Sequence, residues 1–178
     1  MELKRIKDQK GFSLIEFMIA SVILIVGLLA LLMLYTYALV TVTVADENSI
    51  AKQKARETLE SVYTARNTSQ VAFSMINNVS NGGIFLDGPQ PLTTPGGDGL
   101  VGTTDDGGIE VMVTLGDDGI LGTDDDETRV LDYFTRQIII SQPAGVSDLK
   151  TIRVVITYTT PSGLTQSFTV DSLISRYR

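Results

Sequence analysis

The chain of 178 residues contains no cysteine, no histidine and no tryptophan. Without histidine or cysteine there is no Ser-His-Asp or Cys-His catalytic arrangement, no disulfide, and no ordinary zinc, haem or iron-sulfur site. Basic residues are also few, since 14 Lys and Arg face 21 Asp and Glu for a formal net charge of −7. Such an acidic chain does not suit nucleic-acid binding, which neutralises phosphates with Lys and Arg. Chemistry based on oxygen ligands remains well supplied.

Charge is missing from one long stretch near the N-terminus. Residues 1–10 carry four basic and two acidic side chains, and residues 17–45 follow with no charge and many Leu, Ile and Val. As a helix this stretch would be about 44 Å long, which exceeds the roughly 30 Å hydrocarbon core of a bilayer. It is too long for a secretory signal peptide, and the preceding basic residues predict a cytoplasmic N-terminus. A plain signal anchor does not explain Glu16, because an ionisable group in an apolar stretch is costly.

The residues around Glu16 carry a family resemblance. The string KGFSLIE at residues 10–16, between a short basic leader and about 20 apolar residues, resembles the class III leader and N-terminal helix of type IV pilins and type II secretion pseudopilins. The resemblance implies cleavage after Gly11 by a prepilin peptidase and methylation of the new N-terminal Phe12. It also implies that Glu16 neutralises the terminal amine of a neighbouring subunit during assembly. Pairing the two charges would remove two desolvation costs in lipid together.

The same resemblance implies partners and a location. The partners are other pilin subunits in a helical filament, the prepilin peptidase and an inner-membrane assembly platform, and no nucleic acid is indicated. The chain would first sit in the inner membrane with its C-terminal domain exported, and then in a periplasmic or extracellular filament.

Two departures bear on the type of subunit. Many major pilins have a proline where this chain has Met33, and they close a C-terminal loop with a disulfide that is impossible here. Residues 21–32 and 151–178 instead resemble PilV-type minor pilins and I-type pseudopilins. We therefore expect a structural minor pilin or pseudopilin of a type IV pilus or secretion pseudopilus. The alternative is a calcium-dependent adhesin or recognition tip on such a filament. An enzyme is not expected, because no nucleophile or base partner is recognisable.

The helix should continue beyond the apolar stretch. In residues 46–66, apolar residues at helical spacing predict one buried face, formed by Ala51, Ala55, Leu59 and Val62. No proline occurs between residues 12 and 66, so a single helix of about 55 residues is predicted.

The rest of the chain reads as a β-rich head. Alternating apolar residues and turn signals predict an antiparallel sheet of about four strands, from residues 109–115, 130–141, 151–159 and 164–172. The expected fold is α+β, a long N-terminal helical spine packed on a C-terminal antiparallel sheet. The expected organisation is a leader at 1–11, a transmembrane and filament-core helix at 12–45, an amphipathic continuation at 46–66, and a globular β head at 67–178 with acidic repeat loops at 96–128.

An acidic repeat stands out within the head. Residues 98–127 carry ten acidic side chains and no basic one, and the pattern D-G-x-x-G-T-x-D-D occurs at 98–106 and again at 118–126. Calcium takes six to eight oxygen ligands, and glycine-pivoted loops let several oxygens converge. We therefore expect two calcium loops, although solvated Asp-Gly turns remain the alternative. The expected ligands are Asp98, Asp105 and Asp106 in one loop and Asp118, Asp125 and Asp126 in the other, with Glu110, Asp124 and Glu127 as weaker candidates.

Overall fold

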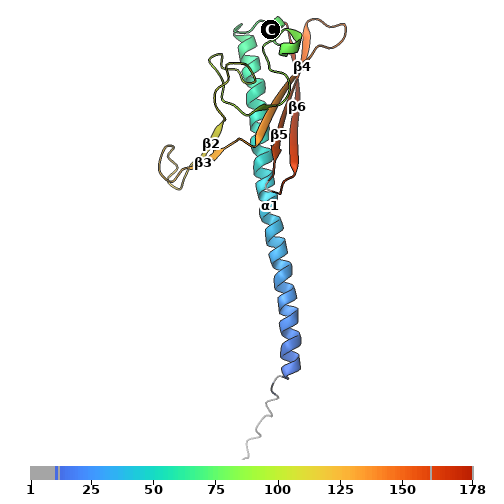
Figure 1. Ribbon diagram of the computed structural model, residues 1–178, viewed down its shortest axis with the longest axis vertical. Coiled ribbons are helices and arrows are strands. Elements are labelled where there is room, and N and C mark those ends of the chain that lie inside the picture. Colours follow the sequence, from blue (N-terminus) through green and yellow to red (C-terminus); the bar gives the residue numbers. More distant parts are fainter. Residues whose placement is uncertain (1–10, 12, 161, 178) are drawn as a thin grey trace, which may run out of the picture. The chain divides into compact units, whose positions relative to one another are not determined.

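A computed structural model describes residue 11 and residues 13–160 and 162–177 of the chain. The chain forms two compact units, Met1–Val42 and Thr43–Arg178. Each unit is described separately below, and Figure 1 shows their elements.

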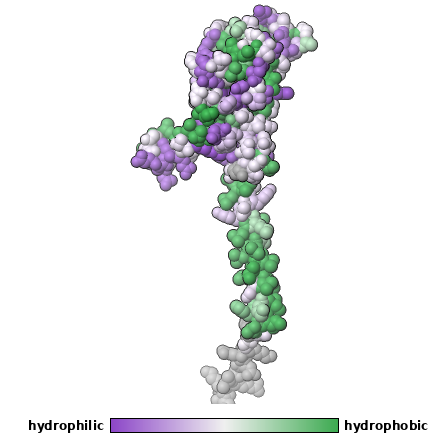
Figure 2. Space-filling view, in the orientation of Figure 1, coloured by the Kyte–Doolittle hydropathy of each residue, from purple (hydrophilic) through white to green (hydrophobic). Residues whose placement is uncertain are grey.

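Helix α1 spans Leu14–Asn67 and contributes to both units. In the first unit its apolar side chains are exposed along the whole helix, as the hydrophobic colouring of Figure 2 shows. Three aliphatic hydroxyl groups in this part bond back to the helix, since Ser21, Thr36 and Thr41 each donate to the carbonyl four residues earlier. Their polar hydrogens are therefore satisfied without water. The helix is long and apolar enough to cross a membrane, and none of its most apolar window is buried inside the protein.

In the second unit the same helix supplies one wall of the core. Its buried residues recur every three or four positions, and they are Glu47, Ile50, Ala51, Ala55, Thr58, Leu59, Val62 and Ala65. The predicted face of small and apolar residues is confirmed. The small side chains let the helix lie close to its neighbours, and most of the charged residues lie on the exposed side, with Glu47 as a buried exception.

A four-stranded antiparallel sheet completes the core. The strands are β1 (Gln90–Pro91), β4 (Phe134–Ser141), β5 (Leu149–Thr159) and β6 (Thr165–Ser175), in the spatial order β1-β4-β5-β6. In β5 every second side chain is buried, including Ile152, Val154 and Ile156, as the alternation predicted. The outward Arg153 pairs with Asp171 across β6 at 2.7 Å.

The predicted strands of this sheet need two corrections. The segment 109–115 was expected to be one of its strands, but β2 (Val111–Thr114) pairs instead with β3 (Glu127–Val130) in a separate two-stranded sheet. The segment 130–141 was expected to be one strand, but Val130 ends β3 and strand β4 begins at Phe134 after a turn. The fourth strand of the main sheet is β1, which has only two residues. An acidic loop of 12 residues joins β2 to β3, and this hairpin pairing satisfies β2 locally. The α+β fold itself, a long helix followed by a four-stranded antiparallel sheet, is as predicted.

The connection between helix and sheet contains two short 3₁₀ turns, η1 (Phe73–Met75) and η2 (Val79–Asn81). Between them the buried Asn78 side chain reaches β4. Its amide donates to the carbonyl of Ile138 at 2.8 Å and accepts from the amide of Ile140 at 2.8 Å. Strand β1 pairs only with Thr135 and Arg136 of β4, so the Asn78 side chain takes over the edge of β4 beyond them.

Candidate functional site

The predicted processing site lies at the start of the described chain. Gly11 is exposed, and Phe12 lies outside the described residues. Helix α1 begins at Leu14, where the carbonyl of Ser13 accepts from the amides of Glu16 and Phe17 at 3.0 and 3.1 Å. Glu16 therefore sits in the first helical turn, where the positive end of the helix dipole favours a carboxylate. Its side chain is exposed and has no basic partner among the described residues, so it is open to one from another chain.

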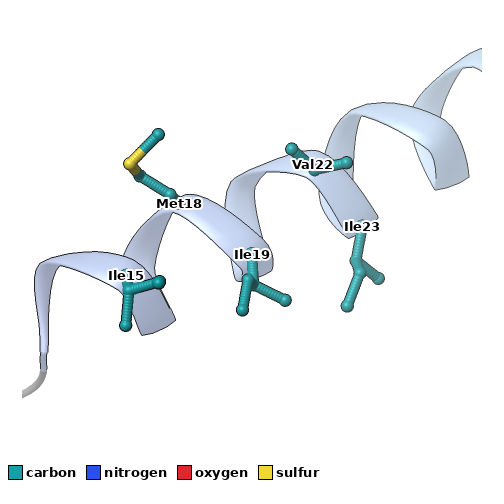
Figure 3. Close-up of a pocket in the computed structure, with 5 residues that line it drawn as sticks. All are labelled: Ile15, Met18, Ile19, Val22 and Ile23. Carbon is teal, nitrogen blue, oxygen red and sulfur yellow. The ribbon is translucent and has the colours of Figure 1, made fainter.

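Around Glu16 the helix surface is apolar. Figure 3 shows Ile15, Ile19 and Ile23 in one row, each a helical turn from the next, with Met18 and Val22 in a neighbouring row. Together they line a shallow apolar hollow with almost no polar surface. Such a stripe is suited to contact with lipid or with another apolar helix.

Two tyrosines lie about 20 residues into the apolar part of helix α1. Tyr35 and Tyr37 are exposed, and tyrosine favours the membrane–water interface because its ring is apolar and its hydroxyl is polar. From Leu14 to Leu34 the helix would span about 31 Å, which matches a bilayer core of about 30 Å. This part of α1 fits a membrane precursor.

The first acidic loop, called loop 1 and comprising residues 96–106, is held by its own carboxylates. Asp98 accepts from the amide of Leu100 at 2.8 Å, and Asp106 accepts from that of Gly102 at 2.7 Å. The Thr103 hydroxyl bonds to both Asp105 and Asp106, at 2.8 and 3.0 Å. The hydrogen bond from Thr103 holds the pKa of Asp105 below its ordinary value, so this carboxylate is ionised at neutral pH.

Loop 2, residues 116–126, repeats the main hydrogen bonds of loop 1. Asp118 accepts from the amide of Ile120 at 2.8 Å, Asp126 from that of Gly122 at 2.6 Å, and Asp125 from the Thr123 hydroxyl at 2.7 Å. The hydrogen bond from Thr123 lowers the pKa of Asp125, and the amides of Gly122 and Gly116 lower that of Asp126. The sequence repeat is thus also a structural repeat.

The structure extends the repeat by two residues that sequence reasoning missed. A side chain at Gly96 would collide with Asp105, whose Cγ lies 2.4 Å from the Cβ position, and one at Gly116 would collide with Asp125 at 2.2 Å. Both loops therefore need glycine two residues before the first aspartate of the repeat pattern, Asp98 or Asp118. The signal was present as a glycine at the same offset in each copy.

The two loops differ in their surroundings. Loop 1 is built into the head: Asp106 accepts from the Thr93 hydroxyl at 2.7 Å and lies 3.9 Å from the buried Arg136 guanidinium. Loop 2 has no such cation near Asp126 among the described residues. Arg136 was invisible to the motif analysis because it lies on β4, 30 residues from the loop it serves.

The weaker ligand candidates take separate positions. Glu110 is buried and contacts two cations, Lys54 at 2.6 Å and Arg136 at 3.5 Å. Glu127 begins β3 opposite Thr114, and Asp124 is exposed in loop 2. Among the described residues no group of three or more carboxylates is already arranged to hold a metal ion. The aspartates of each loop are brought together, but backbone amides and hydroxyls occupy several of their oxygens.

Comparison with known proteins identifies the N-terminal segment. Residues 6–32 match the family described as the prokaryotic N-terminal methylation motif, which is the class III leader of type IV pilins. The matched motif supports a type IV pilin-like protein that is processed by prepilin peptidase. The motif also implies assembly into filaments with other pilins, and together with the apolar helix it fits a precursor anchored in the inner membrane. No curated protein and no solved structure matches the chain.

Proposed function

We propose that this chain is a minor pilin or pseudopilin, a structural subunit cleaved after Gly11 and methylated at Phe12. The observation that carries the proposal is the methylation motif at residues 6–32 directly in front of an apolar helix whose side chains are exposed. Those side chains need lipid before assembly and neighbouring helices after it. Glu16, the single charge in residues 12–45, then pairs with the terminal amine of the adjacent subunit.

Intact-mass analysis tests this function. Chains from sheared surface or periplasmic filaments should lack residues 1–11 and carry one added methyl group. A Gly11→Val chain, with a branched side chain at the cleavage point, should keep its leader and stay in the membrane. The matched Gly27→Val chain, altered where a side chain would meet open space, should be processed normally. A filament protein that still begins at Met1 would contradict the proposal.

We also propose that loops 1 and 2 bind calcium, which is the basis of the alternative function as a calcium-dependent recognition tip. The proposal is supported by the same carboxylates meeting in both loops and by glycines at positive φ, Gly102 at 78° and Gly122 at 91°. Glycine-pivoted carboxylate loops suit the six to eight ligands of Ca²⁺ better than the strict octahedron of Mg²⁺.

Calorimetry on the full chain in detergent tests calcium binding. Ca²⁺ should bind in preference to Mg²⁺ and raise the head's thermal stability by about 1.4 kcal/mol for each tenfold excess of free ion. Asp125→Asn with Asp126→Asn should remove one site. Asp117→Asn is the control, because loop 1 has glycine at the equivalent position. No heat at millimolar Ca²⁺ and no change with chelator would leave solvated turns as the explanation.

A further inference from the structure

The two copies of the repeat place the same apolar pair in opposite environments. In loop 1 the pair is Leu100 and Val101, which are 1% and 6% exposed. In loop 2 the equivalent pair is Ile120 and Leu121, which are 61% and 68% exposed. The loops share internal hydrogen bonds to Asp98 and Asp118, to Asp105 and Asp125, and to Asp106 and Asp126, and they differ most in what surrounds them.

Loop 1 shows what such a loop packs against. Gly102 approaches Ile138 of β4 so closely that a Cβ would lie 2.9 Å from its terminal methyl group, and its carbonyl accepts from the amide of Leu86 at 2.7 Å. The carboxylate of Asp106 faces Arg136. The receptor for a loop of this kind therefore combines apolar surface with a cation, and loop 2 meets neither among the described residues of its own chain.

Loop 2 is carried on an arm, residues 111–130, that is open on one face. On the inner face Met112 packs against the core, and Arg129 bonds to Asp46 and Glu47 of α1 at 2.9 and 3.2 Å. On the outer face Val111, Val113 and Val130 remain half exposed. Figure 1 shows the arm apart from the four-stranded sheet, and Figure 2 shows hydrophobic surface near its base and a hydrophilic end. Four residue pairs alone make a weak hairpin in water, so a covered face would stabilise it.

Two exposed cations of the head, Lys52 and Arg56, have no ion-pair partner among the described residues, and the surface around them is called the Lys52–Arg56 surface. They lie one helical turn apart on α1, where they border a shallow hollow with Ser49, Gln53, Glu57 and Glu60. The same surface therefore includes two acids, Glu57 and Glu60, and Lys54 holds Glu57 at 2.8 Å. Lys52 also lies 6.0 Å from the ring of Phe168, which adds apolar surface. Loop 2 and the first residue of β3 bring six carboxylates without a basic partner, at Asp117, Asp118, Asp124, Asp125, Asp126 and Glu127.

We propose that loop 2 docks on the Lys52–Arg56 surface of a second copy of this chain, with Ile120 and Leu121 buried in the contact. The contact is heterologous, since different surfaces meet, and a heterologous contact repeats into an open chain of subunits rather than closing a dimer. The proposed contact joins the heads of two subunits within the filament, so this inference rests on the proposed function. In this contact Lys52 and Arg56 supply the positive charge for the loop 2 carboxylates, as Arg136 does for Asp106 of loop 1.

Cysteine crosslinking between two differently tagged full-length chains tests the docking, because the natural chain has no cysteine. One chain carries Asp124→Cys in loop 2, and the other carries Gln53→Cys on the Lys52–Arg56 surface. The matched control pairs Gln53→Cys with Thr104→Cys, the equivalent exposed position in loop 1. The disulfide between chains should form at least about tenfold more in the loop 2 pair, because docking raises the effective concentration of the two thiols.

Two sets of variants identify the contact. Ile120→Ser with Leu121→Ser should reduce the crosslink to the control level while the exposed positions leave the head folded. Lys52→Glu with Arg56→Glu should do the same, and Asp117→Lys with Glu127→Lys in the other chain should restore it. Glu60→Gln, which removes a negative charge from the Lys52–Arg56 surface, should preserve or increase the crosslink.

The outcomes separate this inference from the proposed function. A processed chain that enters filaments with no excess loop 2 crosslink overturns the docking and leaves the filament function standing. A crosslink from loop 2 to a different pilin, identified by mass, also overturns it. An excess crosslink in a chain that keeps its leader upholds the docking and contradicts the proposed function.

Discussion

Replacing Asn78 with alanine should destabilise the head strongly, because this one side chain closes the edge of β4. The change removes the donor to the carbonyl of Ile138 and the acceptor for the amide of Ile140, both of which belong to buried residues. A buried backbone group left without a partner costs about 1–3 kcal/mol. Two such groups give a loss of about 3 kcal/mol, a large share of the roughly 5–15 kcal/mol that holds a typical domain together.

Pulse proteolysis of the full chain in detergent, across a urea gradient, measures this loss in the head alone. With a slope of about 2 kcal/mol per molar urea, the midpoint should fall by about 1.5 M. Asn77→Ala is the matched control, because the Asn77 amide makes one hydrogen bond, to the Ser74 carbonyl at 3.2 Å near the surface. Its midpoint should move by less than about 0.3 M. Equal shifts for the two variants would refute the role given to Asn78.

Three further perturbations have defined outcomes. Glu16→Ala should leave membrane insertion intact and reduce entry into sheared filaments by about tenfold or more, because an ion pair worth about 1.4 kcal/mol is lost. Immunoblots of the membrane and filament fractions measure this, and entry at the wild-type level would exclude the pairing with the amine. Lys150→Met should cost about 2–3 kcal/mol in the same urea assay, because the buried Lys150 ammonium donates to the carbonyls of Phe73 and Ile76 at 2.9 and 2.8 Å; an unchanged midpoint would show that water replaces it. The pKa of Asp126 is lowered in the folded loop, so the ionised carboxylate stabilises the fold at pH above the ordinary aspartate pKa. This stabilisation is lost as the pH falls through the lower pKa of the folded state. The amide NMR signal of Gly122 should therefore shift below roughly pH 4, and Asp126→Asn should abolish that titration.

Helix α1 was predictable because its signal is local and long. The absence of proline and the uninterrupted apolar run determine the first part, and the spacing of Ala51, Ala55, Leu59 and Val62 determines the buried face of the second. The buried Glu47 lies on that same face, four residues before Ala51, but it was not among the residues predicted to be buried. Its partner Arg129 lies 82 residues away, which no local pattern reveals.

The sheet was less predictable because pairing depends on distant residues. The alternation in residues 109–115 marked a strand correctly, but it could not show that the partner is β3 rather than the main sheet. Strand β1 was not predicted because it has only two residues, one of them Pro91, and its pairing depends on the position of β4 in the fold.

The candidate sites were also predictable only where their signal is local in the sequence. The acidic loops were visible as a repeat, and the structure shows that each copy gathers its own aspartates. What the repeat could not reveal is that one copy is buried against Arg136 and the other is exposed, because that depends on the surrounding fold. The predictions for Gly11, Phe12 and Glu16 concern a protease, a methyl group and a neighbouring chain, none of which a single folded chain contains.

The end of α1 is tied to the end of the chain, and this has a mechanical consequence. Arg66 donates to the carbonyls of Ser175 and Tyr177, and Tyr63 donates to the carbonyl of Leu173. Part of a pull on the helix therefore reaches the head at the end of β6, which is joined to β5 along 11 residue pairs. A load along that ladder is shared among all of its hydrogen bonds at once, so the head resists tension as a lap joint does, with no covalent crosslink.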